Sequence, residues 1–113
     1  MKLLVTGGAG FIGSNFVHYI LNKRPDWHIT VLDALTYAGN IKNLEGLDEK
    51  RFKFIKGNIC DEGVVNQTIA QCDAVVHFAA ESHVDNSVHS PWPFVNSNVV
   101  GTYQILEAVR KHY

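Results

Sequence analysis

The sequence lacks the features that mark several protein classes. Its 113 residues include only two cysteines and three prolines, and the formal net charge is −1. Two cysteines exclude a disulfide-rich scaffold, and Cys60 and Cys72 do not have metal-site spacing, so both are expected to be reduced thiols. Scattered lysines and arginines argue against nucleic-acid binding. No apolar run approaches the ~18 residues of a membrane span, and no signal peptide precedes the first strand pattern. We expect a cytoplasmic protein with no membrane association and no metal.

Residues 3–13 have the pattern of an apolar strand, a glycine-rich turn and the start of a helix. Gly7, Gly10 and Gly13 are spaced as in turns that hold the diphosphate of a dinucleotide. A side chain at Gly7 or Gly10 would keep the backbone from a pyrophosphate, and one at Gly13 would hold the helix off the strand. The free N–H groups at the helix start favour negative phosphates. The turn therefore predicts a dinucleotide site rather than a purely structural bend.

Asp33 ends the next apolar run, 20 residues after Gly13. An acidic residue at this distance can accept hydrogen bonds from both ribose hydroxyls of the adenosine. Ala34 and Leu35 follow it, and no Arg or Lys lies nearby to pair with a 2′-phosphate. Because a carboxylate repels that phosphate, the sequence favours NAD over NADP.

Strand and helix patterns alternate along the chain, which predicts an α/β fold with a doubly wound parallel sheet in the order 3-2-1-4. Strands are expected at Lys2–Thr6, Ile29–Asp33, Phe52–Lys56 and Ala74–Phe78, the last buried on both faces. Helices are expected at Phe11–Lys23, at Ile41–Leu44, from a cap at Asp61 to about Gln71, and from Pro91 or Pro93 to about Lys111.

The last expected helix has apolar residues at Ile105, Leu106 and Val109. It follows the fourth strand, whereas a doubly wound nucleotide-binding sheet usually has about six strands. Residues 1–113 are therefore interpreted as a partial NAD-binding domain from the N-terminal part of a longer enzyme. The fourth strand is expected to expose an apolar edge.

The whole chain resembles the extended short-chain dehydrogenase/reductase family of nucleotide-sugar enzymes. The glycine turn at residues 6–14 and the run at 98–102 mark the superfamily, and residues 58–61 also fit it. The runs at residues 35–40 and 79–85 are similar to the 4,6-dehydratase branch in particular. The 4-epimerases of the family are expected to differ in both of these runs.

The resemblance implies a lyase that uses tightly held NAD as an internal redox reagent on dTDP-glucose. Oxidation at C4, elimination of water across C5 and C6 and return of the hydride to C6 give dTDP-4-keto-6-deoxyglucose, an intermediate toward rhamnose and other deoxysugars. It also implies a homodimer. Two alternatives remain open: another epimerase or dehydratase of the family, or a non-catalytic NAD-binding module.

Site residues follow from the resemblance position by position. Phe11 and Ile12 are expected to contact the pyrophosphate through their backbone. The residues expected around the adenosine ribose are Asp33, Ala34, Leu35 and Thr36, and those beside the adenine are Asn58 and Ile59. The residues expected near the second ribose and nicotinamide are Phe78, Ala79, Ala80, Glu81 and Ser82, with Ser82 also near the sugar substrate and Ser97 near the cofactor. Asn58 and Ser97 stand where the family usually has Asp and Thr.

The chain has no counterpart of the family's catalytic machinery at the expected place, which is a Tyr-x-x-x-Lys pair and a Thr-Asp-Glu run. Tyr19 and Lys23 match the pair by letters only, because they lie along the first helix, away from the end that faces the cofactor. The chain alone is therefore expected to be inactive, with no catalytic residue of its own. His77 is interpreted as a satisfied core residue and not as a metal ligand.

Overall fold

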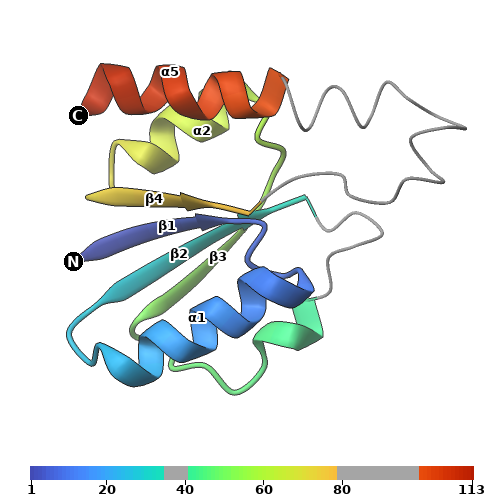
Figure 1. The fold of residues 1–113 in the computed structure, drawn as a ribbon, viewed down its shortest axis with the longest axis vertical. Helices are drawn as coiled ribbons and strands as arrows, with labels where there is room; N and C mark the ends of the chain where they lie inside the picture. The colour runs from blue at the N-terminus through green and yellow to red at the C-terminus, as the bar shows by residue number, and fades with distance from the viewer. Residues whose placement is uncertain (35–40, 79–99) are drawn as a thin grey trace, which may run out of the picture.

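Four parallel strands form the sheet of the computed structural model, which describes residues 1–34, 41–78 and 100–113. The strands are β1 (Lys2–Thr6), β2 (His28–Asp33), β3 (Phe52–Lys56) and β4 (Ala74–His77). Their order is β3-β2-β1-β4, as predicted (Figure 1). The chain builds the sheet in one direction from β1 to β3 and then crosses to the other side for β4. The carboxyl ends of β1 and β4 therefore flank the point where open α/β sheets bind ligands.

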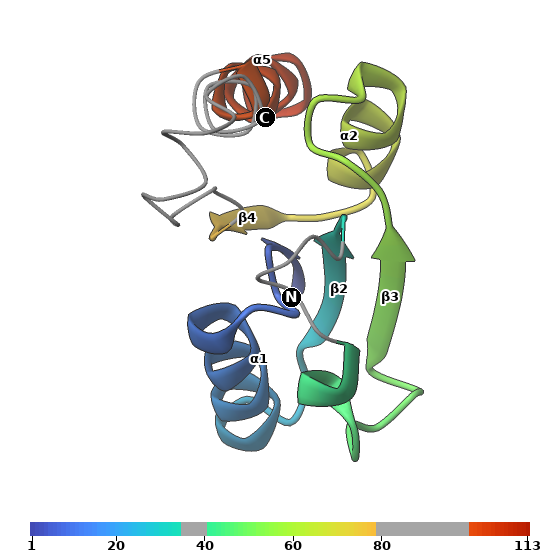
Figure 2. The ribbon, with the colours of Figure 1, turned by 90° about the vertical axis from the view of Figure 1, so that its right-hand side faces the viewer.

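Helices cover both faces of this sheet. α1 (Phe11–Lys23) and the short 3₁₀ helix η1 (Ile41–Leu44) lie on one face, and α2 (Glu62–Ile69) and α5 (Thr102–His112) lie on the other (Figures 1 and 2). The predicted bounds of α1 and η1 are confirmed. Each crossover from strand to helix to parallel strand brings the chain back to the same edge, so the turns after β1, β2 and β3 share that edge.

The core has two parts because successive side chains of a strand point to opposite faces. Leu3 and Val5 of β1 lie in the cluster beneath α1, whereas Leu4 between them lies in the cluster beneath α2 and α5. Leu4 and Val5 are both fully buried. Burial of each such side chain contributes about 1.5–3 kcal/mol. β1 is thus fixed from both faces, and the glycine turn at its end begins from a rigid strand.

Three predicted boundaries differ from the structure. β2 begins at His28, one residue earlier than predicted, and β4 ends at His77, one residue earlier than predicted. The Asp61 cap is confirmed, since its side chain accepts the N–H of Val64, but α2 ends at Ile69 instead of near Gln71. The prediction that β4 is buried on both faces is wrong. All four of its residues are half-buried, because among the described strands β4 pairs only with β1.

The end of α1 is held by a residue that the sequence did not point to. The guanidinium of Arg51 donates to the carbonyl oxygens of Leu21 at 2.9 Å, Arg24 at 2.6 Å and Trp27 at 3.2 Å. These carbonyls belong to the last turn of α1 and the loop behind it, where backbone acceptors have no helical partner. Because Arg51 directly precedes β3, it fixes the C-terminal end of α1 to the start of β3.

α5 is described from Thr102, and its expected start at Pro91 or Pro93 lies outside the described residues. Of the apolar residues noted along this helix, Ile105 is buried, whereas Leu106 is 63% exposed. The next turn of the helix packs through Ala108 instead. None of the described helices is long and apolar enough to cross a membrane.

Candidate functional site

The glycine turn joins β1 to α1 at the carboxyl edge of the sheet. Gly7 has φ +70°, a conformation that residues with a side chain rarely adopt. Its N–H donates to the carbonyl oxygen of Leu32 at 2.9 Å, and the N–H of Gly10 donates back to the carbonyl oxygen of Gly7 at 3.1 Å. The turn is therefore tied to β2 and closed on itself before α1 begins.

Close packing explains two further glycines. A Cβ on Gly13 would lie 2.2 Å from the carbonyl oxygen of Gly7, so the predicted need for glycine at this position is confirmed, with the turn rather than the strand as the neighbour. Gly8 was not singled out by the sequence. A Cβ there would lie 2.7 Å from a methyl carbon of Val31, because the turn passes directly over β2.

The first turn of α1 is open. Phe11 is 81% exposed and Ile12 is 67% exposed. Gly10 caps the helix without a side-chain hydrogen bond, and no acidic residue lies in the first turn. The first N–H groups of a helix have no partner within it, and the helix dipole adds positive potential there. This end of α1 can therefore bind an anion through its backbone.

Asp33 reaches the turn from the end of β2. Asp33 is 8% exposed, and its Oδ2 accepts the N–H of Ala9 at 2.9 Å in a buried hydrogen bond. The sequence predicted Asp33 as a ribose ligand but not this second task of holding the turn. A carboxylate with two acceptor oxygens can do both, because each oxygen accepts more than one hydrogen bond. Ala34, which follows it, is half-buried.

The residues expected beside the adenine follow β3. The N–H of Gly57 donates to the carbonyl oxygen of Asp33 at 3.1 Å, so the next residue, Asn58, lies beside the end of β2. Asn58 is exposed, and its Oδ1 accepts the N–H of Cys60 at 2.9 Å. Ile59 points into the core and is 5% exposed, which leaves its backbone as the part that can meet a ligand.

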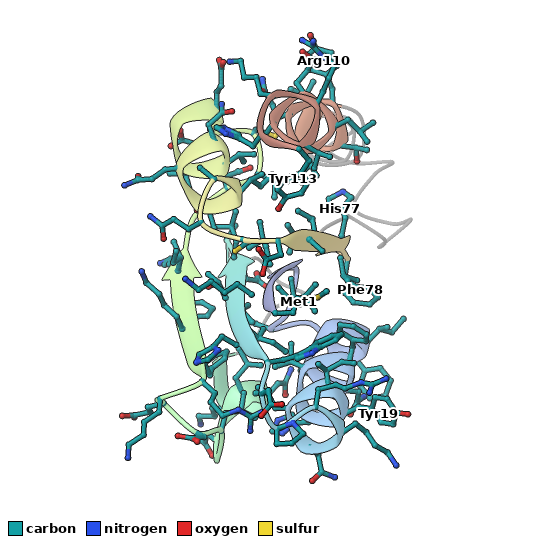
Figure 3. The ribbon with its side chains drawn as sticks, turned by 90° about the vertical axis from the view of Figure 1, so that its left-hand side faces the viewer. Met1, Tyr19, His77, Phe78, Arg110 and Tyr113 are labelled. Atoms are coloured by element: carbon teal, nitrogen blue, oxygen red, sulfur yellow. The ribbon has the colours of Figure 1, made fainter. Side chains whose placement is uncertain are left out.

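At the end of β4, His77 and Phe78 point to opposite faces of the sheet (Figure 3). The two ring nitrogens of His77 form hydrogen bonds with the hydroxyls of Thr6 at 2.6 Å and Thr102 at 3.0 Å. Burial lowers the pKa of His77, so the ring is neutral near pH 7. Both ring nitrogens of His77 are thus satisfied, as predicted, although the residue is half-buried and not part of the buried core. The ring of Phe78 packs on Phe16 of α1, with the ring centroids 5.4 Å apart.

Several predicted site residues lie outside the described part of the chain. They are Leu35, Thr36, Ala79, Ala80, Glu81, Ser82 and Ser97. Tyr19 and Lys23 are described. Tyr19 is exposed on α1, two turns from the start of the helix (Figure 3). The Lys23 ammonium lies 5.9 Å from the centroid of the Tyr19 ring. Tyr19 and Lys23 therefore contact each other and not the glycine turn.

Metal ligation and thiol chemistry find no support in the part of the chain that the structure describes. No group of three or more His, Cys, Asp or Glu side chains in it could hold a metal ion. Cys60 and Cys72 form no disulfide, and burial raises the pKa of both thiols, so they stay protonated near neutral pH.

One polar contact of the glycine turn was not predicted from the sequence. The side-chain amide of Asn43, on η1, donates to the carbonyl oxygen of Ala9 at 2.9 Å. The two residues are 34 positions apart, so no local pattern could have indicated the contact. Gly8, by contrast, could have been noticed as a fourth glycine of the turn.

Comparisons with known proteins point to one family. A family model described as GDP-mannose 4,6 dehydratase matches residues 4–113. A dTDP-glucose 4,6-dehydratase of Mycobacterium tuberculosis is 56% identical over 112 residues, which cover 99% of this chain and 34% of the relative. A crystal structure of a dTDP-glucose 4,6-dehydratase of Streptomyces venezuelae with NAD bound is 46% identical with a TM-score of 0.92, covering 99% of this chain and 36% of that one.

A more distant structure shares the fold. A UDP-glucose 4-epimerase of Thermus thermophilus in complex with NAD is 32% identical with a TM-score of 0.85, covering 99% of this chain and 34% of that one. The chain thus spans about a third of the length of the curated relatives it matches, since the match covers 34% of the Mycobacterium tuberculosis relative. The glycine turn, the parallel sheet and the match over residues 4–113 agree, and the chain belongs to the GDP-mannose 4,6 dehydratase family.

Proposed function

We propose that this chain binds NAD at the glycine turn. The observation that carries the proposal is the turn itself: Gly7 at φ +70°, the contact that only glycine permits at position 13, and the open start of α1. A diphosphate there would meet backbone N–H groups and the positive end of a helix dipole. Asp33, already in contact with the turn through Ala9, supplies the acceptor for the adenosine ribose.

The remaining ligand contacts are proposed from the family resemblance. Phe11 and Ile12 contact the diphosphate through their N–H groups, and Asn58 and the backbone of Ile59 lie beside the adenine. The other residues proposed around the ribose, nicotinamide and sugar are Ala34, Leu35, Thr36, Phe78, Ala79, Ala80, Glu81, Ser82 and Ser97. NAD is preferred over NADP because the Asp33 carboxylate would repel a 2′-phosphate.

For the protein to which this domain belongs, we propose the activity of its relatives, dTDP-glucose 4,6-dehydration. Bound NAD supplies the hydride acceptor and donor for oxidation at C4 and reduction at C6, between which water is lost across C5 and C6. The part of the work assigned to residues 1–113 is to bind the cofactor and hold its ribose and diphosphate in place. Two relatives named dTDP-glucose 4,6-dehydratase are 56% and 58% identical, against 32% for the epimerase structure, which favours dehydration over epimerisation.

We further propose that residues 1–113 are a partial NAD-binding domain and do not turn over dTDP-glucose by themselves. General acid–base catalysis needs a group within hydrogen-bond reach of the proton it moves. Tyr19 and Lys23 lie on the exposed side of α1 and cannot fill that role. The resemblance is the basis for proposing a homodimer. It also supports a cytoplasmic location, with which the absence of a disulfide at Cys60 and Cys72 agrees.

The cofactor proposal is tested by isothermal titration of NAD and NADP into the purified chain. NAD is expected to bind with a stoichiometry of one and more tightly than NADP. The activity is tested by incubating the intact enzyme with dTDP-glucose and following formation of the 4-keto product. Formation of a 4-epimer instead would show that the enzyme is an epimerase and not a dehydratase. Absence of NAD binding would refute the whole proposal.

A further inference from the structure

The peptide groups on both sides of Ala9 are held by side chains from two different elements. Asp33 Oδ2 accepts the N–H of Ala9 at 2.9 Å, and the amide Nδ2 of Asn43 donates to the carbonyl oxygen of Ala9 at 2.9 Å. Ala9 is fully buried, so water cannot readily replace either partner. Ala9 lies within the glycine turn, between Gly8 and Gly10.

Planarity of the peptide bond makes these two contacts act on the turn. The N–H of Ala9 shares a rigid plane with the carbonyl of Gly8, and the carbonyl of Ala9 shares one with the N–H of Gly10. Asp33 therefore sets the orientation of the first plane, and Asn43 sets that of the second. The Gly10 N–H, which closes the turn onto the Gly7 carbonyl oxygen at 3.1 Å, is oriented by the plane that Asn43 holds.

Asn43 is itself fixed in place. It lies on η1, whose next residue, Leu44, is 5% exposed and packs in the core beneath α1. The Nε2 atom of His18, on α1, forms a 2.8 Å hydrogen bond with the backbone oxygen of Asn43. The side-chain amide of Asn43 therefore extends from a backbone that is anchored to both the core and α1.

We propose that Asn43 is a positioning residue of the dinucleotide site. By holding the Ala9 carbonyl, it keeps the Gly7–Gly10 turn in the shape that receives a diphosphate. This inference rests on the proposed function, because it assumes that the turn binds the diphosphate of NAD. Asp33 holds the peptide plane between Gly8 and Ala9 and is also proposed to bind the ribose. Asn43 acts only on the part of the turn that binds the diphosphate.

A positioning role for Asn43 affects the binding of ligands with a diphosphate and not the binding of adenosine, whereas a merely structural role would affect both alike. Without the Asn43 amide, the buried Ala9 carbonyl loses its donor and the second peptide plane is free to turn. Ligands that carry a diphosphate should therefore bind more weakly. Adenosine has no phosphate and relies on the ribose and base contacts, so its affinity should not change.

The test compares Asn43→Ala and the isosteric Asn43→Asp with the unaltered chain. Titration calorimetry measures NAD and ADP binding, and NMR titration measures the weaker binding of adenosine. Loss of this part-buried hydrogen bond should raise the dissociation constants of NAD and ADP about tenfold. Asn43→Asp, which keeps the shape but cannot donate, should lose at least as much. Adenosine affinity should stay within about twofold of the unaltered value.

A matched control comes from α2, where the amide Nδ2 of Asn66 donates to the carbonyl oxygen of Glu62 at 2.9 Å. Asn66→Ala removes the same kind of hydrogen bond far from the turn and should leave NAD binding unchanged. His18→Ala, which removes only the support of the Asn43 backbone, should give a smaller loss than Asn43→Ala and serves if the direct variants fold poorly.

The outcomes separate this inference from the proposed function. Asn43 variants that bind NAD as tightly as the unaltered chain overturn the inference alone. Equal losses for NAD and adenosine also overturn it, since they indicate general loosening of the fold. If the unaltered chain does not bind NAD, both the proposed function and the inference are wrong, because there is then no diphosphate for the turn to hold.

Discussion

Replacement of Gly13 by alanine adds a single methyl group at the tightest contact of the turn. The new Cβ would lie 2.2 Å from the carbonyl oxygen of Gly7 and 3.0 Å from the Cα of Gly8. Both neighbours are backbone atoms and cannot rotate away, so α1 must retreat by about 1 Å to reach ordinary contact distance. Overpacking of this kind costs about 1–3 kcal/mol of folding free energy.

The same displacement moves the N–H groups of α1 away from the proposed diphosphate position. A misplacement of about 1 Å can weaken a positioned interaction by up to about 100-fold, so we expect the dissociation constant of NAD to rise on the order of 10- to 100-fold in Gly13→Ala. Calorimetry measures the NAD affinity, and urea denaturation of the ligand-free chain measures the folding free energy.

Gly63 in α2 offers the matched control. A Cβ there would have its nearest neighbour, the Asp61 carboxylate oxygen, at an ordinary 3.5 Å. Gly63→Ala should therefore leave NAD binding unchanged and stabilise the chain by up to about 1 kcal/mol, because alanine is the better helix former. The steric argument is refuted if Gly13→Ala binds NAD and unfolds in urea as the unaltered chain does.

Three further changes test other parts of the site. Asp33→Ala should weaken NAD binding about tenfold or more and reduce the preference for NAD over NADP; equal losses for both cofactors in calorimetry would contradict the ribose assignment. Asn58→Asp should strengthen NAD binding about two- to fivefold, because one carboxylate oxygen can keep the Cys60 N–H while the other accepts from the adenine amino group; unchanged affinity would place the adenine elsewhere. Burial lowers the pKa of His77 below its ordinary 6.5, so the unfolded chain takes up a proton more readily than the folded chain. The free energy of unfolding should therefore be unaffected by this group above about pH 6.5 and should fall as the pH drops below that value. In His77→Gln this part of the pH dependence of urea denaturation should disappear, and an unchanged profile would assign it to other groups.

The sequence predicted the turn well because its constraints are local. Gly7 at positive φ and Gly13 under the Gly7 carbonyl are required by the turn itself, and the strand and helix patterns on either side show where it lies. Asp33 was also found from spacing alone, since the length of α1 and β2 fixes how far along the chain the second carboxyl end lies. The strand order followed from the alternation of strands and helices.

The contacts that were missed depend on tertiary packing. Asn43 reaches Ala9 only because η1 packs on α1, and Arg51 reaches the end of α1 from the start of β3. Neither contact leaves a signal in the sequence around the residue. Leu106 is one of the apolar residues of the last helix, but one helical step from buried Ile105 is enough to turn it outward, where it is 63% exposed.

A crystal structure of the chain grown with NAD would measure most directly what the glycine turn does. We predict phosphate oxygens within hydrogen-bond distance of the backbone N–H groups of Phe11 and Ile12, and ribose hydroxyls on the Asp33 carboxylate. Dinucleotide density away from the start of α1, or a ribose that does not touch Asp33, would contradict the account.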